Sequence, residues 1–289
     1  MIVVCIHQES LNLYLVIKVK INGGNTVAFI QCNFFSEVLS ISTSMNVILP
    51  ENTQNQIGMK GNRTQEKIPV LYLLHGFSDD HTIWARRTSI ERYVASYGIA
   101  VVMPQVDHSF YTDMEYGKRY WTFLSEELPR VVQSFFPISD KREDNFVAGL
   151  SMGGYGAFKW ALRKPEMFAA AASLSGALDI AGHMEIERKP SNPIEKALYH
   201  VYGGKELERT EEDLFHLIKQ LRENKEDIPE LFQACGTEDF LFEENERFLE
   251  IAKKYDVPLT TSFSKGEHEW GYWDQMIQEV LKWLPINNK

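Results

Sequence analysis

One stretch of the sequence decides the fold class: Asn145-Phe146-Val147-Ala148-Gly149-Leu150-Ser151-Met152-Gly153-Gly154-Tyr155-Gly156. Its first half is a short apolar run typical of a buried strand, and its second half predicts the start of a helix. Ser151 lies on the turn between them. Such a turn is strained and projects the serine hydroxyl clear of the sheet, so its neighbours two positions away must be small. Gly149 and Gly153 meet that requirement, and the stretch therefore predicts Ser151 as a nucleophile.

Short apolar runs alternate with helical patterns along the rest of the chain. The predicted strands are 42–49, 69–74, 99–103, 145–150, 170–174, 231–235 and 260–263, and the predicted helices are 83–97, 116–136, 155–163, 211–223, 244–255 and 271–283. This alternation indicates an α/β fold with a mostly parallel central sheet covered by helices on both faces. In such sheets ligands bind beyond the carboxyl ends of the strands, which is where Ser151 falls.

Length and composition favour one domain. The chain has 289 residues, 44% of them hydrophobic, which is enough to bury a large core. We interpret residues 27–289 as this domain. Within it, residues 178–228 are mostly polar and helical and lie between two predicted strands, so we expect a small cap-like helical insertion over the site.

The first 26 residues form a separate case. Their apolar stretches are interrupted by Gln8, Glu9 and Ser10, and they have neither a basic start nor a small-residue cleavage site, so they make a poor signal peptide. Our hypothesis is that residues 1–26 are a non-native or disordered extension. Codons for Gly23 and Gly24 can encode a ribosome-binding site upstream of a GTG start at Val27, and a native chain beginning at Met1 would refute the idea.

Charge and cysteine usage narrow the class of partner. A net charge of −10 argues against nucleic acid or an anionic membrane surface as the main partner, and a small-molecule substrate is expected instead. No apolar run approaches the ~20 residues that span a bilayer. Cys5, Cys32 and Cys235 lie far apart, fit no metal-ligand spacing and suit a reducing, cytoplasmic compartment. The oligomeric state stays open, a homo-oligomer included.

The residues that would stabilise an oxyanion follow from the position of the turn. The apolar run 69–74 ends in His75-Gly76-Phe77. In folds with this strand–serine–helix turn, one oxyanion donor comes from the loop after such a strand and the other from the residue after the nucleophile. We assign the donors to the backbone N–H groups of Phe77 and Met152, each worth ~3–4 kcal/mol of transition-state stabilisation. His75 is interpreted as a structural member of this loop.

A general base and an acid are expected after the last two strands. His268 follows the run 260–263 and precedes the final predicted helix, whereas the chain's other histidines lie before the strand of the acid or in the doubtful extension. Glu238 and Asp239 both follow the run 231–235 and either can orient the imidazole. Asp239 is favoured because it directly precedes an apolar pair, and Glu238 stays the alternative. The order Ser151, Asp239, His268 matches that of the turn's usual fold.

Two aromatic residues are further candidates. Tyr116 and Trp121 follow the strand 99–103 and are expected to reach the rim of the site as substrate-binding residues. Ordinary packing of an aromatic helix is the alternative interpretation.

Several blocks resemble one family in order along the chain. They resemble the esterase D-like α/β-hydrolases, and most of all bacterial tributyrin esterases, with S-formylglutathione hydrolases and acetyl-xylan or feruloyl esterases as relatives: Leu74-His75-Gly76-Phe77-Ser78, Trp84-Ala85-Arg86-Arg87-Thr88, Gly149-Leu150-Ser151-Met152-Gly153-Gly154-Tyr155-Gly156, Cys235-Gly236-Thr237-Glu238-Asp239-Phe240 and Gly266-Glu267-His268-Glu269-Trp270. The resemblance runs from about residue 29 to the end. It implies an α/β-hydrolase fold, a Ser-His-Asp triad and a preference for short acyl chains.

These observations together predict a serine carboxylesterase. It would hydrolyse acetyl to butyryl esters through an acyl-enzyme on Ser151, with no metal or organic cofactor. An S-formylglutathione hydrolase-type thioesterase and a carbohydrate acetyl esterase are the alternatives within hydrolases. A catalytically inactive binding module is the alternative from another class, but such proteins typically lose the serine or the histidine, and both are present here.

Overall fold

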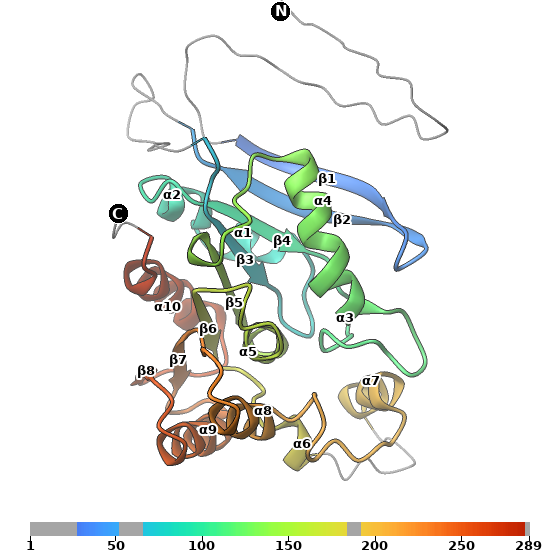
Figure 1. Ribbon diagram of the computed structural model, residues 1–289, viewed down its shortest axis with the longest axis vertical. Helices are drawn as coiled ribbons and strands as arrows, with labels where there is room; N and C mark the ends of the chain where they lie inside the picture. The colour runs from blue at the N-terminus through green and yellow to red at the C-terminus, as the bar shows by residue number, and fades with distance from the viewer. Residues whose placement is uncertain (1–27, 52–65, 184–191, 287–289) are drawn as a thin grey trace, which may run out of the picture.

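The computed structural model describes residues 28–51, 66–183 and 192–286 (Figure 1). Its sheet has 8 strands in the order β1-β2-β4-β3-β5-β6-β7-β8. The strands are β1 (Ala28–Ser36), β2 (Ile41–Leu49), β3 (Val70–Leu74), β4 (Ala100–Pro104), β5 (Asn145–Leu150), β6 (Ala170–Leu174), β7 (Glu230–Gly236) and β8 (Leu259–Ser264). From β4 to β8 all neighbours pair in parallel, and β2 alone runs against them, since it pairs antiparallel with both β1 and β4. The predicted mostly parallel sheet is confirmed.

Strand β1 is absent from the sequence prediction. It pairs with β2 along its whole length, from Ala28 opposite Leu49 to Ser36 opposite Ile41. Its residues alternate between half-buried and exposed, with only the last one fully buried. An edge strand of this kind has no continuous apolar run, so it lacks the signal that identified the inner strands.

The helices lie between the strands along the chain, except for the last one, which follows β8. They are α1 (Ile83–Arg87), α2 (Ile90–Val94), α3 (Tyr120–Thr122), a π-helical turn (Phe123–Glu127), α4 (Leu128–Phe135), a 3-10 turn (Arg142–Asp144), α5 (Met152–Arg163), α6 (Ile180–His183), α7 (Pro193–Tyr202), α8 (Leu214–Glu223), α9 (Phe242–Lys254) and α10 (Trp270–Trp283). Two predicted helices are corrected. The helix 83–97 is broken where Thr88 becomes extended and its hydroxyl bonds to the Trp84 carbonyl. The helix 116–136 begins only at Tyr120, because Asp113 and Arg119 first pair across a turn.

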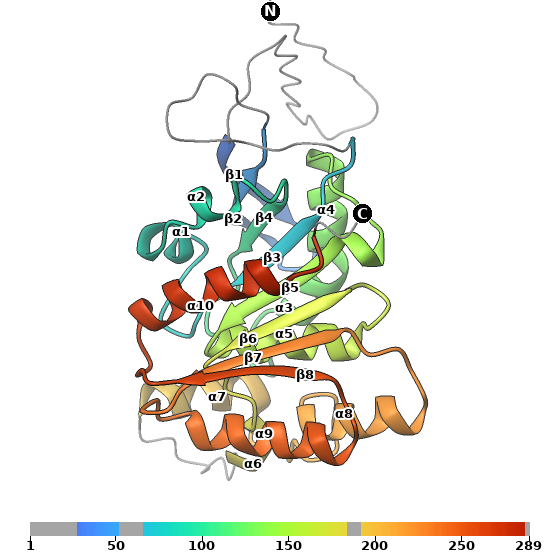
Figure 2. The same cartoon turned by 90° about the vertical axis from the view of Figure 1, so that its left-hand side faces the viewer.

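Helices cover both faces of the sheet. Along β3, Leu71 and Leu73 belong to a core with α1, α2 and α10, whereas Val70, Tyr72 and Leu74 belong to the core under α4, α5 and α9. Figure 2 shows α10 crossing in front of the sheet while α5 lies behind it. This alternation along one strand explains why the inner strands are apolar on both sides.

The segment between β6 and β7 carries α6, α7 and α8. Helix α8 packs against α5 and α9, so this part of the segment belongs to the layer that covers the sheet (Figure 2). The interpretation of residues 178–228 as a cap over the site stays a prediction, and residues 1–26 lie outside the described residues. Among the described helices, none is both long and apolar enough to cross a membrane.

Candidate active site

The carboxyl ends of the parallel strands meet at one edge of the sheet. Register pairs Leu74 at the end of β3 with Gly149 near the end of β5, and Leu174 at the end of β6 with Ala234 in β7. The loops that follow these strands therefore leave the sheet side by side. They carry Ser151 after β5 and the oxyanion loop after β3, as well as the acid and the histidine after β7 and β8.

Ser151 occupies a strained turn at the start of α5. Its φ of 53° and ψ of −118° lie outside the regions that ordinary residues prefer. The surrounding backbone is too close for side chains. A Cβ at Gly149 would lie 2.2 Å from the Gly153 carbonyl oxygen, and one at Gly153 would lie 2.5 Å from the Leu74 carbonyl oxygen. Both glycines are thus required by close packing of the helix on β3, which is the physical basis of the motif.

The three predicted triad residues are brought together. The His268 Nε2 atom lies 3.1 Å from Ser151 Oγ, and its Nδ1 atom lies 2.9 Å and 3.0 Å from the two Asp239 carboxylate oxygens. A carboxylate only accepts hydrogen bonds, so it favours a proton on Nδ1 and leaves Nε2 free to accept the serine proton. The arrangement can activate a serine for attack on a carbonyl carbon.

Asp239, and not its neighbour Glu238, contacts the histidine. The Asp239 side chain is fully buried, and the Leu241 N–H also donates to it at 2.9 Å. Burial would raise the pKa of Asp239, but the hydrogen bonds from His268 and Leu241 outweigh it and hold that pKa below its usual range. Glu238 instead pairs with Lys265 at 3.7 Å on the surface.

The two predicted oxyanion donors flank Ser151. Met152 is the first residue of α5, so its N–H has no partner within the helix, and the helix dipole adds positive charge there. Phe77 follows Gly76, which is close to the serine: a Cβ added at Gly76 would lie 3.7 Å from Ser151 Cβ. Over the described residues, neither N–H donates to a protein acceptor, so both are available for a ligand oxygen.

Two residues beside the triad have no signature in the motifs. Ser175 follows β6 with a φ of 47°, and its hydroxyl is among the groups that lower the pKa of Asp239 by hydrogen bonding. Trp273 donates from Nε1 to Ser175 Oγ at 3.1 Å, and its ring lies edge-on to His268 at 4.8 Å. The one sequence signal for Ser175 is its place at the carboxyl edge, directly after a core strand.

Aromatic rings lie close to the proposed catalytic groups. Phe240 is 74% exposed, and its ring lies 4.5 Å from that of His268. On the oxyanion loop, the centroid of the Phe77 ring lies 4.3 Å from that of His108, on which it stacks, and 5.9 Å from that of Phe110. Aromatic side chains therefore lie next to His268 and next to the residue of the proposed oxyanion N–H. The described residues contain no group of His, Cys, Asp and Glu that could hold a metal ion.

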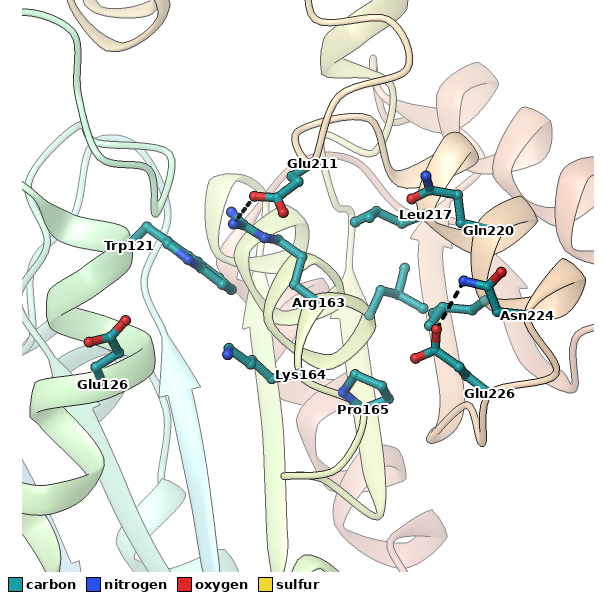
Figure 3. A pocket seen from close by; sticks show the side chains of 12 residues that line it. Trp121, Glu126, Arg163, Lys164, Pro165, Glu211, Leu217, Gln220, Asn224 and Glu226 are labelled. Atoms are coloured by element: carbon teal, nitrogen blue, oxygen red, sulfur yellow. Dashed lines mark hydrogen bonds and ion pairs between the residues drawn. The ribbon is translucent and has the colours of Figure 1, made fainter.

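The structure does not bring Trp121 to Ser151. Trp121 lies under the Arg163 guanidinium at 3.9 Å, at the far end of α5 from the serine. There it lines a cavity of about 390 Å³ with Arg163, Glu211 and other mostly polar residues (Figure 3). Tyr116 is 57% exposed and stacks on Tyr199 of α7 at 5.7 Å. Their predicted role in binding substrate stays a prediction.

Known proteins resemble this chain over most of its length. The Esterase family model, described as "Putative esterase", matches residues 36–284. An acetyl esterase of Caldicellulosiruptor saccharolyticus is 32% identical over 262 residues, covering 89% of this chain and 98% of that protein.

Two solved structures from Staphylococcus aureus are similar throughout. Fluorophosphonate-binding serine hydrolase F is 35% identical with a TM-score of 0.80, covering 92% of this chain and 100% of its own. An S-formylglutathione hydrolase is 35% identical with a TM-score of 0.77, covering 91% and 100%. The α/β-hydrolase fold is confirmed by these neighbours, and the chain belongs to the Esterase family of serine hydrolases and is a carboxylic ester hydrolase.

Proposed function

We propose that the protein is a serine carboxylesterase that hydrolyses short-chain acyl esters through Ser151, His268 and Asp239. The observation that carries the proposal is the continuous hydrogen-bonded series from Asp239 through both ring nitrogens of His268 to Ser151 Oγ. Membership of a family of ester hydrolases supports the type of reaction, and the hydrogen-bond geometry supports the choice of residues.

The first half of the reaction forms an acyl-enzyme. His268 Nε2 takes the hydroxyl proton of Ser151 while Oγ attacks the ester carbonyl carbon. The carbonyl oxygen becomes an oxyanion, which accepts hydrogen bonds from the N–H groups of Phe77 and Met152. Asp239 stabilises the imidazolium without taking its proton. The tetrahedral intermediate then collapses: His268 gives the proton to the leaving alcohol, and the acyl group stays on Ser151.

The second half repeats these steps with water as the nucleophile. His268 removes a proton from water as the water attacks the acyl carbon, and the same N–H groups hold the new oxyanion. Collapse returns the proton from His268 to Ser151 Oγ and releases the carboxylic acid. On the protein, the cycle uses only His268 Nε2 and Ser151 Oγ to take up and release protons.

The acyl group is proposed to be small, acetyl to butyryl. Support comes from the similar acetyl esterase and from bulky rings near the oxyanion loop. The Phe77 ring packs on Phe110, which in turn contacts Tyr155 and Tyr202. Rings of this size next to an oxyanion donor favour a short acyl chain. A cytoplasmic location is part of the proposal, supported by the unpaired thiols Cys32 and Cys235.

A thioesterase acting on S-formylglutathione is the second candidate. It is favoured by the 35% identity to a protein solved as an S-formylglutathione hydrolase. Comparing kcat/KM for p-nitrophenyl acetate, p-nitrophenyl butyrate, S-formylglutathione and acetylated xylose separates the candidates. A preference for the thioester by more than about 100-fold would replace the ester proposal.

The proposed nucleophile is tested by Ser151→Ala. Removing a triad member typically lowers kcat by about 10⁴–10⁶. We expect a loss of this size with p-nitrophenyl acetate and an unchanged melting temperature. The control is Ser125→Ala, which removes a buried hydroxyl on the π-helical turn that donates to the Trp121 carbonyl. A Ser151→Ala protein that keeps a tenth of wild-type activity would refute the assignment.

A further inference from the structure

The hydrogen bonds of the His75 ring allow only one of its tautomers. The ring is 1% exposed, and the Val106 N–H donates to its Nε2 at 3.2 Å. A backbone N–H can only donate, so Nε2 carries no proton. Nδ1 lies 2.8 Å from the Gly76 carbonyl oxygen, an acceptor, so Nδ1 carries the proton and donates it there. Burial lowers the pKa of His75 to about 4, in agreement with a neutral ring.

The carbonyl that accepts this hydrogen bond belongs to a functional peptide unit. The Gly76 C=O and the Phe77 N–H are the two ends of one planar trans peptide, so they point in opposite directions. Fixing the direction of the carbonyl therefore fixes the direction of the N–H. The carbonyl is held from the protein side by His75 Nδ1 and by the Asp79 N–H at 3.3 Å.

We propose that His75 is a positioning residue that aims the Phe77 N–H at the oxyanion by holding the Gly76 carbonyl. The inference rests on the proposed function, because it requires Phe77 to be an oxyanion donor. His75 itself touches neither the substrate nor Ser151, and it acts only through the peptide.

Further contacts hold the residues that precede Gly76 in the oxyanion loop. Tyr111 donates its hydroxyl to the His75 carbonyl at 2.8 Å, and Trp84 donates from Nε1 to the Leu74 carbonyl at 3.0 Å. On the other side, Gly153 of α5 packs directly against the Leu74 and His75 carbonyls. The peptide between Gly76 and Phe77 is thus the last unit before the substrate, and His75 sets its orientation.

Two substitutions separate the two hydrogen bonds of the ring. In His75→Asn the amide nitrogen takes the place of Nδ1 and can donate to Gly76, but the contact with Val106 is lost. In His75→Gln the amide oxygen takes the place of Nε2 and can accept from Val106, but the bond to Gly76 is lost. We expect His75→Gln to lower kcat/KM for p-nitrophenyl acetate by about 10–100-fold, less than deletion of an oxyanion donor. His75→Asn should restore it to within about fivefold of wild type.

A second readout reports on the oxyanion itself. A trifluoromethyl ketone forms an adduct with the serine that carries an oxyanion in the same place, so its inhibition constant should rise in His75→Gln by the same factor as kcat/KM falls. The control is the secondary alcohol with a methyl group in place of the trifluoromethyl group. It has no carbonyl and forms no adduct, so its affinity should be unchanged. A merely structural role would weaken both compounds together, or would make His75→Asn the worse variant, and either outcome overturns the proposal.

The tautomer is tested in the wild-type protein, independently of any variant. Nitrogen chemical shifts of ¹⁵N-histidine-labelled protein should show His75 as the neutral Nδ1–H form at pH 7. An Nε2–H or doubly protonated ring would overturn the proposal even if a variant does not fold. Failure of the proposed function is a different result, because the wild-type protein would then hydrolyse none of the esters.

Discussion

Two neighbouring carboxylates, Glu238 and Asp239, follow β7, and only the second one faces the histidine. The turn after β7 directs Asp239 inward, where His268 and the Leu241 N–H bind it, and leaves Glu238 to a surface lysine. Sequence order alone placed both residues at the correct edge of the sheet. It could not choose between them with certainty, because a change of one position in a turn reverses which side chain points inward.

This difference gives a paired prediction. We expect Asp239→Asn to lower kcat by about 10²–10⁴-fold, because an amide no longer stabilises the imidazolium or selects the Nδ1–H tautomer. Glu238→Gln is the matched control and should stay within about twofold of wild type, since its partner Lys265 is exposed. Steady-state kinetics with p-nitrophenyl acetate measure both. Equal losses in the two variants would contradict the assignment of the acid.

The buried His75 gives a pH dependence of stability. Burial is the main cause that lowers its folded pKa to about 4, against the hydrogen bond to the Gly76 carbonyl and the attraction of Asp80 and Asp107. The unfolded ring takes up a proton below about pH 6.5, so the unfolded state binds more protons between pH 6.5 and 4. His75 thus stabilises the fold above pH 6.5, and this contribution is lost as the pH falls to about 4.

Between these two pKa values the unfolded state binds one proton more than the folded state, and this difference sets the size of the effect. The slope is about 1.4 kcal/mol per pH unit, so the free energy of unfolding of the wild type should fall relative to His75→Asn by up to ~3 kcal/mol. Urea denaturation of both proteins at pH 7, 5.5 and 4.5 measures the difference. Parallel curves for the two proteins across this range would show that His75 does not titrate as described.

At the scale of elements, one buried ion pair ties the segment between β6 and β7 to the helix that follows the nucleophile. Lys159 of α5 is fully buried and binds Glu212 at 2.5 Å, Thr112 Oγ1 at 2.7 Å and the Tyr111 carbonyl at 3.0 Å. Burial lowers the pKa of Lys159 to about 8 although Glu212 opposes this, so the amine is charged at neutral pH. The pair joins three segments that are far apart in the sequence.

Breaking this pair should destabilise the fold. Lys159→Met leaves the Glu212 carboxylate with weaker compensation, and we expect a loss of about 2–4 kcal/mol in the free energy of unfolding. Glu212→Gln should cost a similar amount, and the double variant less than the sum of the two. The matched control is Lys219→Met, which removes an exposed pair with Glu223 and should change stability by less than about 0.5 kcal/mol. Additive single effects in urea denaturation would refute the coupling.

Helix boundaries show where local patterns fail. The apolar spacing of residues 83–97 suits one helix, yet Thr88 bonds to its own preceding turn and the Ile90 N–H, which ends α1 and starts α2. A short polar side chain that competes for backbone groups leaves little mark on hydrophobic periodicity. The predicted helix 155–163 and α5 end at the same residue, but α5 already begins at Met152, directly after the nucleophile.

For the molecule as a whole, the order of chemistry along the chain was more predictable than the arrangement of the strands in space. Ser151 and the oxyanion loop each follow a buried strand and His268 follows the edge strand β8, and because these strands are parallel the sheet gathers all three at one edge. Strand order in the sheet and the edge strand β1 depend on long-range pairing that no local pattern encodes. The contacts of Ser175 and Trp273 have no local signal for the same reason, since only the folded sheet brings Ser175 to Asp239 and Trp273 to Ser175.

If Ser151 is the nucleophile of an acyl-transfer site, it should be the residue that a covalent serine reagent modifies. A fluorophosphonate reacts with an activated serine and is not released by water, so the modified residue can be located by peptide mass spectrometry. We predict one phosphonyl group per chain, on the peptide that contains Ser151, with complete loss of esterase activity and no label on Ser151→Ala. A label on another side chain, or full activity after stoichiometric modification of Ser151, would contradict the account.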